Sequence, residues 1–256
     1  MIVKKTKEYN LSKGYLPCEK YTEAEAKELD AILENKIKRV GYGTRAGVVE
    51  AARFLTLQFP YKINYYLENG RLDTSSGTPY VDGEGRYYHK GLYLDSSKYK
   101  NIVASYSGPS MWGCPLPYNS YYKGYSRDNT NGLDCSGYIT WAFYNAGFDT
   151  EDSGAGDFPY KDKDLEARNT YRVTEEFLNK KVLKAGDIIY YWGHVAMVAG
   201  IKEDDYYVTE ALWYDPTYAV VIKKYSKSEL IDEFSHVILL DEYYKDEGNY
   251  TEMWEY

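Results

Sequence analysis

Cysteine and histidine are scarce in this chain. Its 256 residues include 3 cysteines and 3 histidines. An odd, sparse set of cysteines does not form a disulfide framework, and no Cys-x-x-Cys pair or histidine cluster has the spacing of a zinc site. We therefore expect no metal and no cofactor, and any thiol or imidazole chemistry must come from a few identifiable side chains.

Long apolar runs and a basic charge balance are also missing. No stretch approaches the ~20 apolar residues that cross a bilayer, so we expect no membrane-spanning segment. The basic residues 1–7 are not followed by an apolar core, so they do not predict a signal peptide as they stand. The net charge of −8 argues against nucleic acid as a partner. The oligomeric state is left open.

Tyrosine, by contrast, is abundant, with 32 residues in the chain. Tyrosine packs well at half-buried surfaces, so the excess suits a groove for polar, sugar-like or peptide ligands. A compositional bias of the source genome explains it equally simply. The hydrophobic fraction of 44% and charged fraction of 27% are those of an ordinary globular protein, long enough for one large or two modest domains.

The most informative stretch is Asp134-Cys135-Ser136-Gly137. Apolar residues follow it at three- and four-residue spacing up to Gly147, which predicts a short helix. Asp134 is then the N-cap and Cys135 lies in the first turn. The unpaired N–H groups of a helix start favour an anion, so the thiolate of Cys135 is favoured as a nucleophile.

A cysteine nucleophile needs a base, and His194 has the best context for that role. It follows Gly193 and opens the apolar strand pattern of residues 195–198. His89 lies in a polar loop pattern, and His236 begins a predicted core strand, where it can simply be packed. We take His194 as the candidate base.

Glu210 is the candidate for a third polar group that orients the base. It lies in the otherwise apolar and β-branched residues 206–212. If this strand pairs with the one that His194 opens, the carboxylate lies beside the imidazole and fixes its tautomer. The alternative is a solvent-facing strand position. Asp187 and Asp215 are weaker candidates for the same role.

The remaining pattern predicts an α+β fold. Thr22 and Glu25 form a capping box for a helix to about Arg39, and Thr44 caps a second helix that ends at Phe59. Residues 1–104 form a smaller, mainly helical and irregular region that is accessory or shapes a cleft. Residues 105–256 form the second domain, in which the Cys135 helix packs on an antiparallel sheet of about five strands. These strands are expected at residues 187–192, 194–201, 206–212, 219–225 and 236–240, with residues 149–172 as an exposed excursion.

Four sequence elements occur in the order of a known family. They are residues 134–137, Gly186-Asp187, residues 193–198 and the earlier Trp112-Gly113. Together they resemble the NlpC-type family of papain-like cysteine peptidases, which cleave bacterial cell-wall peptides. The match covers about residues 105–240. The first ~100 residues contain none of the wall-binding repeats expected of such proteins.

The resemblance implies a papain-like domain with Cys135 as nucleophile, His194 as base and Glu210 at the third polar position. Family members more often carry His, Asn or Gln at that position. Asp134 and Ser136 match positions that can contact the substrate peptide, although Asp134 can equally be purely a helix cap.

Three aromatic residues complete the expected substrate-binding set: Trp112, Tyr118 and Trp192. The family often has a tyrosine near the oxyanion site, two residues before its Trp-Gly. Ser110 stands there in this chain, and Tyr106 or Tyr118 are possible substitutes. Cys114 replaces a common second glycine and is either structural or a bystander thiol near the cleft.

The expected function is hydrolysis of an amide in the peptidoglycan stem peptide, most simply at the γ-D-glutamyl–diamino acid bond. Alternatives on the same fold are an N-acetylmuramoyl-L-alanine amidase, a phage lysin or effector, or an acyltransferase. An alternative of another class is a catalytically idle module that binds glycan or protein. Peptidoglycan or a muropeptide is the expected partner. The resemblance implies a secreted or cell-wall-associated protein whose signal or anchor lies outside this chain, with a cytoplasmic or phage-encoded protein as the alternative.

Overall fold

The computed structural model describes residues 23–59, 63, 65, 91, 93–94, 110–111, 133–150, 154–155, 159–160, 162–214 and 219–249. The helices of these parts are α1 (Glu23–Val40), α2 (Arg45–Arg53), the π-helix η2 (Phe54–Gln58), α4 (Cys135–Asn145), α5 (Lys163–Arg168), α6 (Glu175–Asn179) and α7 (Lys227–Glu233). The strands are β1 (Tyr93–Leu94), β2 (Ser110–Met111), β3 (Thr170–Arg172), β4 (Ile188–Tyr191), β5 (His194–Lys202), β6 (Asp205–Leu212), β7 (Ala219–Ser226) and β8 (His236–Ile238).

The main sheet has six antiparallel strands in the order β3-β8-β4-β5-β6-β7. Five of them lie where the apolar patterns predicted strands, and the sixth is the short edge strand β3. Helix α7 begins with the predicted capping box, in which Ser226 and Glu229 bond reciprocally. The α+β class is therefore confirmed.

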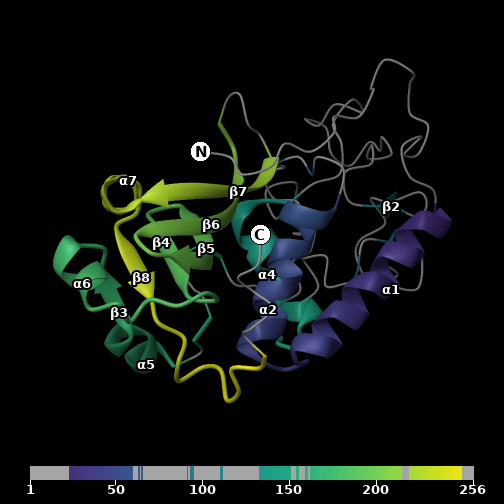
Figure 1. Cartoon of the computed structure of the whole chain (residues 1–256), viewed down its shortest axis with the longest axis horizontal. Coiled ribbons are helices and arrows are strands. Elements are labelled where there is room, and N and C mark those ends of the chain that lie inside the picture. The colour runs from purple at the N-terminus through teal and green to yellow at the C-terminus, as the bar shows by residue number, and fades with distance from the viewer. Residues whose placement is uncertain are drawn as a thin grey trace, which may run out of the picture.

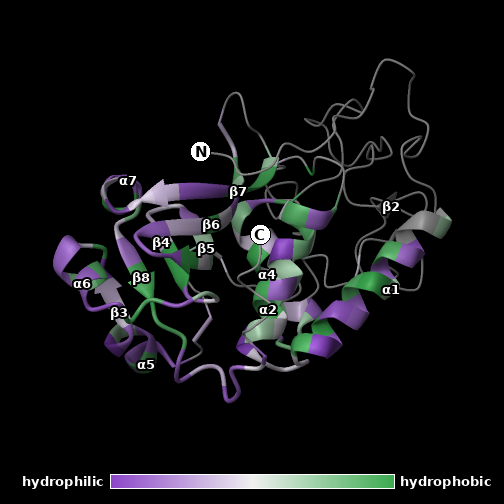
Figure 2. Cartoon of the chain, viewed as in Figure 1, coloured by the Kyte–Doolittle hydropathy of each residue, from purple (hydrophilic) through white to green (hydrophobic). Residues whose placement is uncertain are grey.

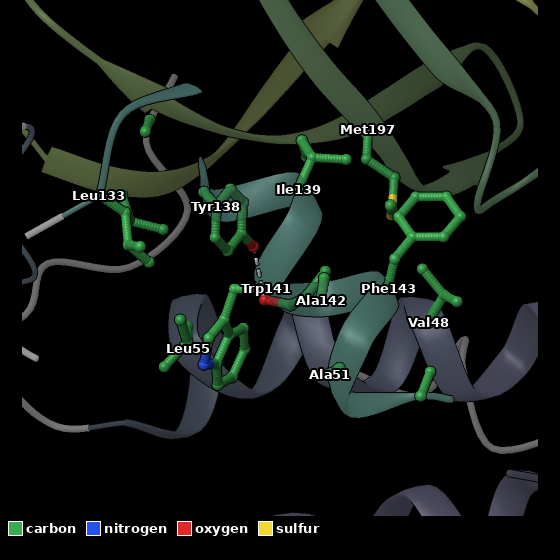
Figure 3. Close-up of a cluster of buried hydrophobic side chains, with 14 of the residues drawn as sticks. Val48, Ala51, Leu55, Leu133, Tyr138, Ile139, Trp141, Ala142, Phe143 and Met197 are labelled. Carbon is green, nitrogen blue, oxygen red and sulfur yellow. Dashed lines mark hydrogen bonds between the residues drawn. The ribbon is translucent and has the colours of Figure 1, made fainter. Parts of the chain in front are cut away.

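Helix α4 lies between α2 and one face of the sheet (Figure 1). Its side chains are almost all buried, and Figure 3 shows Phe143 and Ile139 directed toward Met197 of β5 while Val48 and Ala51 of α2 close the other side. These residues share one hydrophobic core. The opposite face of the sheet is covered by α6 and α7, which form a second core with Val198, Val208 and their neighbours. The sheet is thus buried on both faces around β5 and β6.

The first two helices have the predicted signals at their junction. Gly41 and Gly43 adopt positive φ angles of 127° and 77°, and Thr44 caps α2 by accepting a hydrogen bond from the Gly47 N–H. The cap expected at Thr22 lies outside the described residues. Every residue of α2 is buried, and the exposed face of α1 is polar (Figure 2). The boundary at residue 105 stays a prediction, and α2 contributes to the same core as α4.

An ion pair joins α2 to the sheet. The guanidinium of Arg45 lies 2.7 Å from Asp187, which precedes β4, and 2.5 Å from Asp241. Gly186, with a φ of 90°, allows this approach, because a Cβ there would lie 2.8 Å from the Arg45 side chain. The close approach of Arg45 therefore explains the Gly186-Asp187 motif. Asp187 binds Arg45 and does not orient His194.

Part of the expected excursion at residues 149–172 is regular. Asp162 caps α5 by accepting hydrogen bonds from the N–H groups of Asp164 and Leu165, and β3 pairs with β8 through Thr170–Ile238. The six-residue helix is polar and buries no residue fully. Neither element has the apolar period on which the prediction relied, which is why the sequence indicated a loop. None of the described helices is long and apolar enough to cross a membrane.

Candidate active site

Cys135 is the first residue of α4, as the sequence predicted. Asp134 is the N-cap, and its Oδ1 accepts a hydrogen bond of 2.6 Å from the Gly137 N–H and one of 3.2 Å from the Ser136 hydroxyl. The backbone N–H of a first helical residue has no carbonyl partner within its own helix. The thiol of Cys135 therefore sits at the positive end of α4, and the residue is 6% exposed.

His194 is the first residue of β5 and follows a tight turn at Trp192-Gly193. Gly193 has a φ of 84°, and His194 pairs with Tyr191 across the hairpin. The imidazole packs against two rings, with centroid distances of 4.9 Å to Tyr191 and 6.4 Å to Phe234, and these two rings lie 6.1 Å from each other. At 1% exposure, the imidazole is held rigidly by its neighbours.

Glu210 lies beside His194, as predicted. The Nε2 atom of His194 is 2.9 Å from Oε2 of Glu210, and the carboxylate is fully buried. The prediction assumed that the two strands pair, and they do, from Lys202–Asp205 to Met197–Thr209. His194 and Glu210 lie just beyond the last of these pairs, while β6 stays paired with β7 to Leu212.

Cys135 lies close enough to His194 to act on the charge of the imidazole. Nδ1, the nitrogen that does not bind Glu210, is buried and makes no hydrogen bond with any described residue. Burial lowers the pKa of His194, but the influence of Cys135 and the bond and charge of Glu210 outweigh this and raise the pKa to about 9. The imidazolium is thus favoured at neutral pH, which is the partner that a thiolate needs.

The other predicted residues have varied placements. Asp134 and Ser136 are buried at the start of α4, whereas the indole of Trp192 is 96% exposed at the hairpin tip beside His194. His236 is partly exposed, and its ring stacks on that of Tyr190 at a centroid distance of 5.3 Å. It lies on β8, which β4 separates from the strand β5 that carries His194. The predicted residues that lie outside the described parts of the chain are Cys18, His89, Tyr106, Trp112, Cys114, Tyr118 and Asp215.

Three residues near the site were not predicted. The Tyr225 hydroxyl donates a 2.7 Å hydrogen bond to Oε1 of Glu210, and Nζ of Lys223 lies 3.8 Å from the same oxygen. Trp213, which is 58% exposed, lies close to the hydroxyl of Tyr191. The alternation of β7 places Lys223 and Tyr225 on one face, but only the register of β6 against β7 brings that face to Glu210.

Comparison with known proteins adds little to this geometry. No family model matches the chain, and no curated protein matches it. Among solved structures, the crystal structure of Ly7917 is similar over 41% of this chain and 52% of its own length, with 17% identity and a TM-score of 0.27. The chain therefore spans about half the length of that structure.

Proposed function

We propose that this chain is a papain-like cysteine hydrolase of the NlpC type, with Cys135 as nucleophile, His194 as base and Glu210 as the group that orients the base. One observation carries the proposal. Cys135, at the start of α4, lies close to the imidazole of His194, whose Nε2 is bound to a fully buried carboxylate. This is the connectivity of a nucleophile–base–orienter triad.

The proposed reaction is acyl transfer to water. The Cys135 sulfur attacks the amide carbonyl, and the backbone N–H of Cys135 stabilises the resulting oxyanion. The His194 imidazolium gives its proton to the leaving amine, so the C–N bond breaks and a thioester remains. Neutral His194 then takes a proton from water as the water oxygen attacks the thioester, so the C–S bond breaks, the carboxylic acid leaves and the thiolate–imidazolium pair is restored. Glu210 holds the imidazole and balances its positive charge throughout.

The preferred substrate is the γ-D-glutamyl–diamino acid bond of peptidoglycan stem peptides. Support comes from the four motifs in family order and from the exposed indoles of Trp192 and Trp213 near His194. An exposed indole offers a large apolar face with a polar edge, which suits a sugar ring or a peptide plane.

The test is digestion of purified peptidoglycan with the full chain and with Cys135→Ala, followed by mass spectrometry of the soluble products. We expect products with a new amino group on the diamino acid and a free γ-carboxyl on D-glutamate. The variant should release them at least about 10³-fold more slowly. Equal release by both proteins would contradict the nucleophile assignment.

The same digestion separates the alternatives. Cleavage between N-acetylmuramic acid and L-alanine would identify an amidase, and transfer to an added amine in place of water would identify an acyltransferase. Binding without any cleavage would indicate an idle glycan- or protein-binding module. Each outcome has a distinct product mass, so one experiment distinguishes them.

A further inference from the structure

Both carboxylate oxygens of Glu210 accept hydrogen bonds, and only one of the two partners is the base. Oε2 is bound to His194, whereas Oε1 accepts the Tyr225 hydroxyl at 2.7 Å and lies 3.8 Å from Nζ of Lys223. Glu210 is 0% exposed. A fully buried carboxylate stays ionised only when its oxygens accept hydrogen bonds or face positive charge. Tyr225 therefore supplies a donor on the side of the carboxylate that His194 does not occupy.

The fold fixes the Tyr225 ring firmly. Tyr225 pairs with Tyr206 across β6 and β7, while Glu210 pairs with Val221, so the ring extends along the strand to reach the carboxylate. It packs edge-on against Phe234, at a centroid distance of 5.6 Å and an interplanar angle of 73°. Phe234 is itself stacked on His194. The Phe234 ring therefore contacts both Tyr225, which binds the orienting carboxylate, and His194, the base.

The Tyr225 hydroxyl remains a donor at every working pH. Burial raises the pKa of Tyr225, and the charge of Glu210 raises it further. Nζ of Lys223 lies 4.5 Å from the centre of the Tyr225 ring and donates a 3.3 Å hydrogen bond to Tyr214. The other charged or titratable groups that act on this cluster are Glu233 of α7 and Tyr191 of β4.

We propose that Tyr225 is a positioning residue of the triad, which holds the Glu210 carboxylate in place and directs Oε2 toward His194. This inference rests on the proposed function, because it assigns Tyr225 a role through Glu210 and His194 in the same reaction. Lys223 assists from the same strand by facing Oε1. Tyr225 itself does not contact the substrate.

The proposal makes a specific prediction for Tyr225→Phe. The ring and its contact with Phe234 are retained, but Oε1 loses its only hydroxyl donor among the described residues. The carboxylate is then held less firmly against Nε2, so it supports the imidazolium of His194 less strongly and the raised pKa of His194 falls. The alkaline limb of the pH–rate profile of hydrolysis should move down by about one pH unit.

The experiment measures two rates from about pH 3 to about pH 10: hydrolysis of a muropeptide, and alkylation of Cys135 by iodoacetamide, quantified by peptide mass spectrometry. The proteins are the full chain, Tyr225→Phe, Glu210→Gln, the double variant and Tyr206→Phe. Tyr206 is the matched control, because it is buried in the same core, pairs with Tyr225 and has no described bond to Glu210. Thermal unfolding is recorded for each protein.

The alkaline limb of hydrolysis should shift in Tyr225→Phe and not in Tyr206→Phe. The double variant should show no shift beyond that of Glu210→Gln, because the charge through which Tyr225 acts is already gone. An unmoved alkaline limb in Tyr225→Phe, or an added shift in the double variant, would overturn the positioning role. Alkylation reports on the thiol without a substrate, so this failure is distinct from that of the proposed function, in which Cys135→Ala would still hydrolyse peptidoglycan.

Discussion

At the scale of the residue, His194 is the group through which Glu210 acts on the thiol of Cys135. Its Nε2 is bound to Glu210 at 2.9 Å, which leaves Nδ1, buried and without a described partner, as the nitrogen available to the thiol. The tautomer is therefore set by the carboxylate and not by the substrate. Because its pKa is raised to about 9, the imidazolium exists through neutral pH and is lost as the pH rises through that value.

Glu210→Gln should lower the alkaline limit of the pH range in which the protein hydrolyses its substrate. The amide oxygen can still accept the Nε2–H bond, but the negative charge that favours the imidazolium is gone. Hydrolysis, which needs the imidazolium as proton donor, should therefore fall off about one to three pH units lower than in the unmodified chain. The pH–rate profile of hydrolysis measures this. An alkaline limb that does not move would contradict the role of the charge.

Asp134 has two candidate roles that substitution separates. Asp134→Asn retains a side-chain oxygen for the Gly137 N–H, so stability should change by only a few tenths of a kcal/mol, whereas Asp134→Ala should cost about 1 kcal/mol. If Asp134 is only a cap, Asp134→Asn keeps full activity. If its charge also binds a substrate amino group, the KM of Asp134→Asn rises while stability is unchanged. Urea unfolding and kinetics on one muropeptide distinguish the two.

The sequence predicted the three central residues because each carries a local signal. Asp134 with Cys135 marks a helix start, Gly193 with His194 marks a turn into a strand, and Glu210 interrupts an apolar run. Tyr225 and Lys223 carry no such signal. One tyrosine among 32 does not stand out, and neither does a lysine at a strand position that the sequence gives no reason to bury. Their role depends on the register of β7 against β6, which apolar alternation alone does not fix.

At the scale of the element, α2 is fixed to the sheet by charge as well as by packing. Arg45 is fully buried with Asp187, and Asp187 also accepts the N–H groups of Lys184 and Leu240. This joins the start of α2 to the entrance of β4 and the chain after β8. Since α4 packs between α2 and the sheet, the same link holds the helix that carries Cys135.

Arg45→Met should therefore destabilise the fold by about 3–5 kcal/mol, because it leaves the buried Asp187 carboxylate without its cation. Guanidinium unfolding measures the loss. Lys38→Met is the control, since Lys38 pairs with Glu34 on the exposed face of α1 and should cost less than about 0.5 kcal/mol. A small effect of Arg45→Met, comparable with that control, would contradict the role of the pair.

The elements that the sequence missed are those whose existence depends on a partner. Strand β3 has three residues and an exposed middle, so its alternation is too short to detect, and it is a strand because β8 offers a free edge. Helix α5 is polar on all sides and is defined by its Asp162 cap. The long buried strands β5, β6 and β7 carry strong periodic signals, as do α2 with its Thr44 cap and α4 with its Asp134 cap, and all of these were predicted.

At the scale of the whole molecule, the candidate site lies where three layers meet. The helix α4 arrives from one face of the sheet, α7 with Phe234 closes the other, and β5 and β6 stop pairing between them. Two exposed indoles, Trp192 and Trp213, flank this end of the sheet. A long polymer would meet these surfaces together with the thiol, whereas a short peptide would meet the thiol alone.

Trp192→Ala should therefore affect polymer and peptide substrates differently. Loss of one stacking surface should raise the KM for intact peptidoglycan about 2- to 10-fold, with little change for a small soluble muropeptide and no change in kcat. Steady-state kinetics on the two substrates measure the difference. Tyr171→Ala, at an exposed position on the edge strand β3, is the control. An equal rise in KM for both substrates would contradict a separate binding surface.

The central claim is that Cys135 is activated by His194, and selective alkylation tests it most directly. The full chain is treated with a limiting amount of iodoacetamide at about pH 6, and modification of Cys135, Cys18 and Cys114 is quantified by peptide mass spectrometry. The account predicts that Cys135 reacts fastest and that this preference disappears in His194→Ala. If Cys135 reacts no faster than the other two thiols, or equally fast without His194, the account is contradicted.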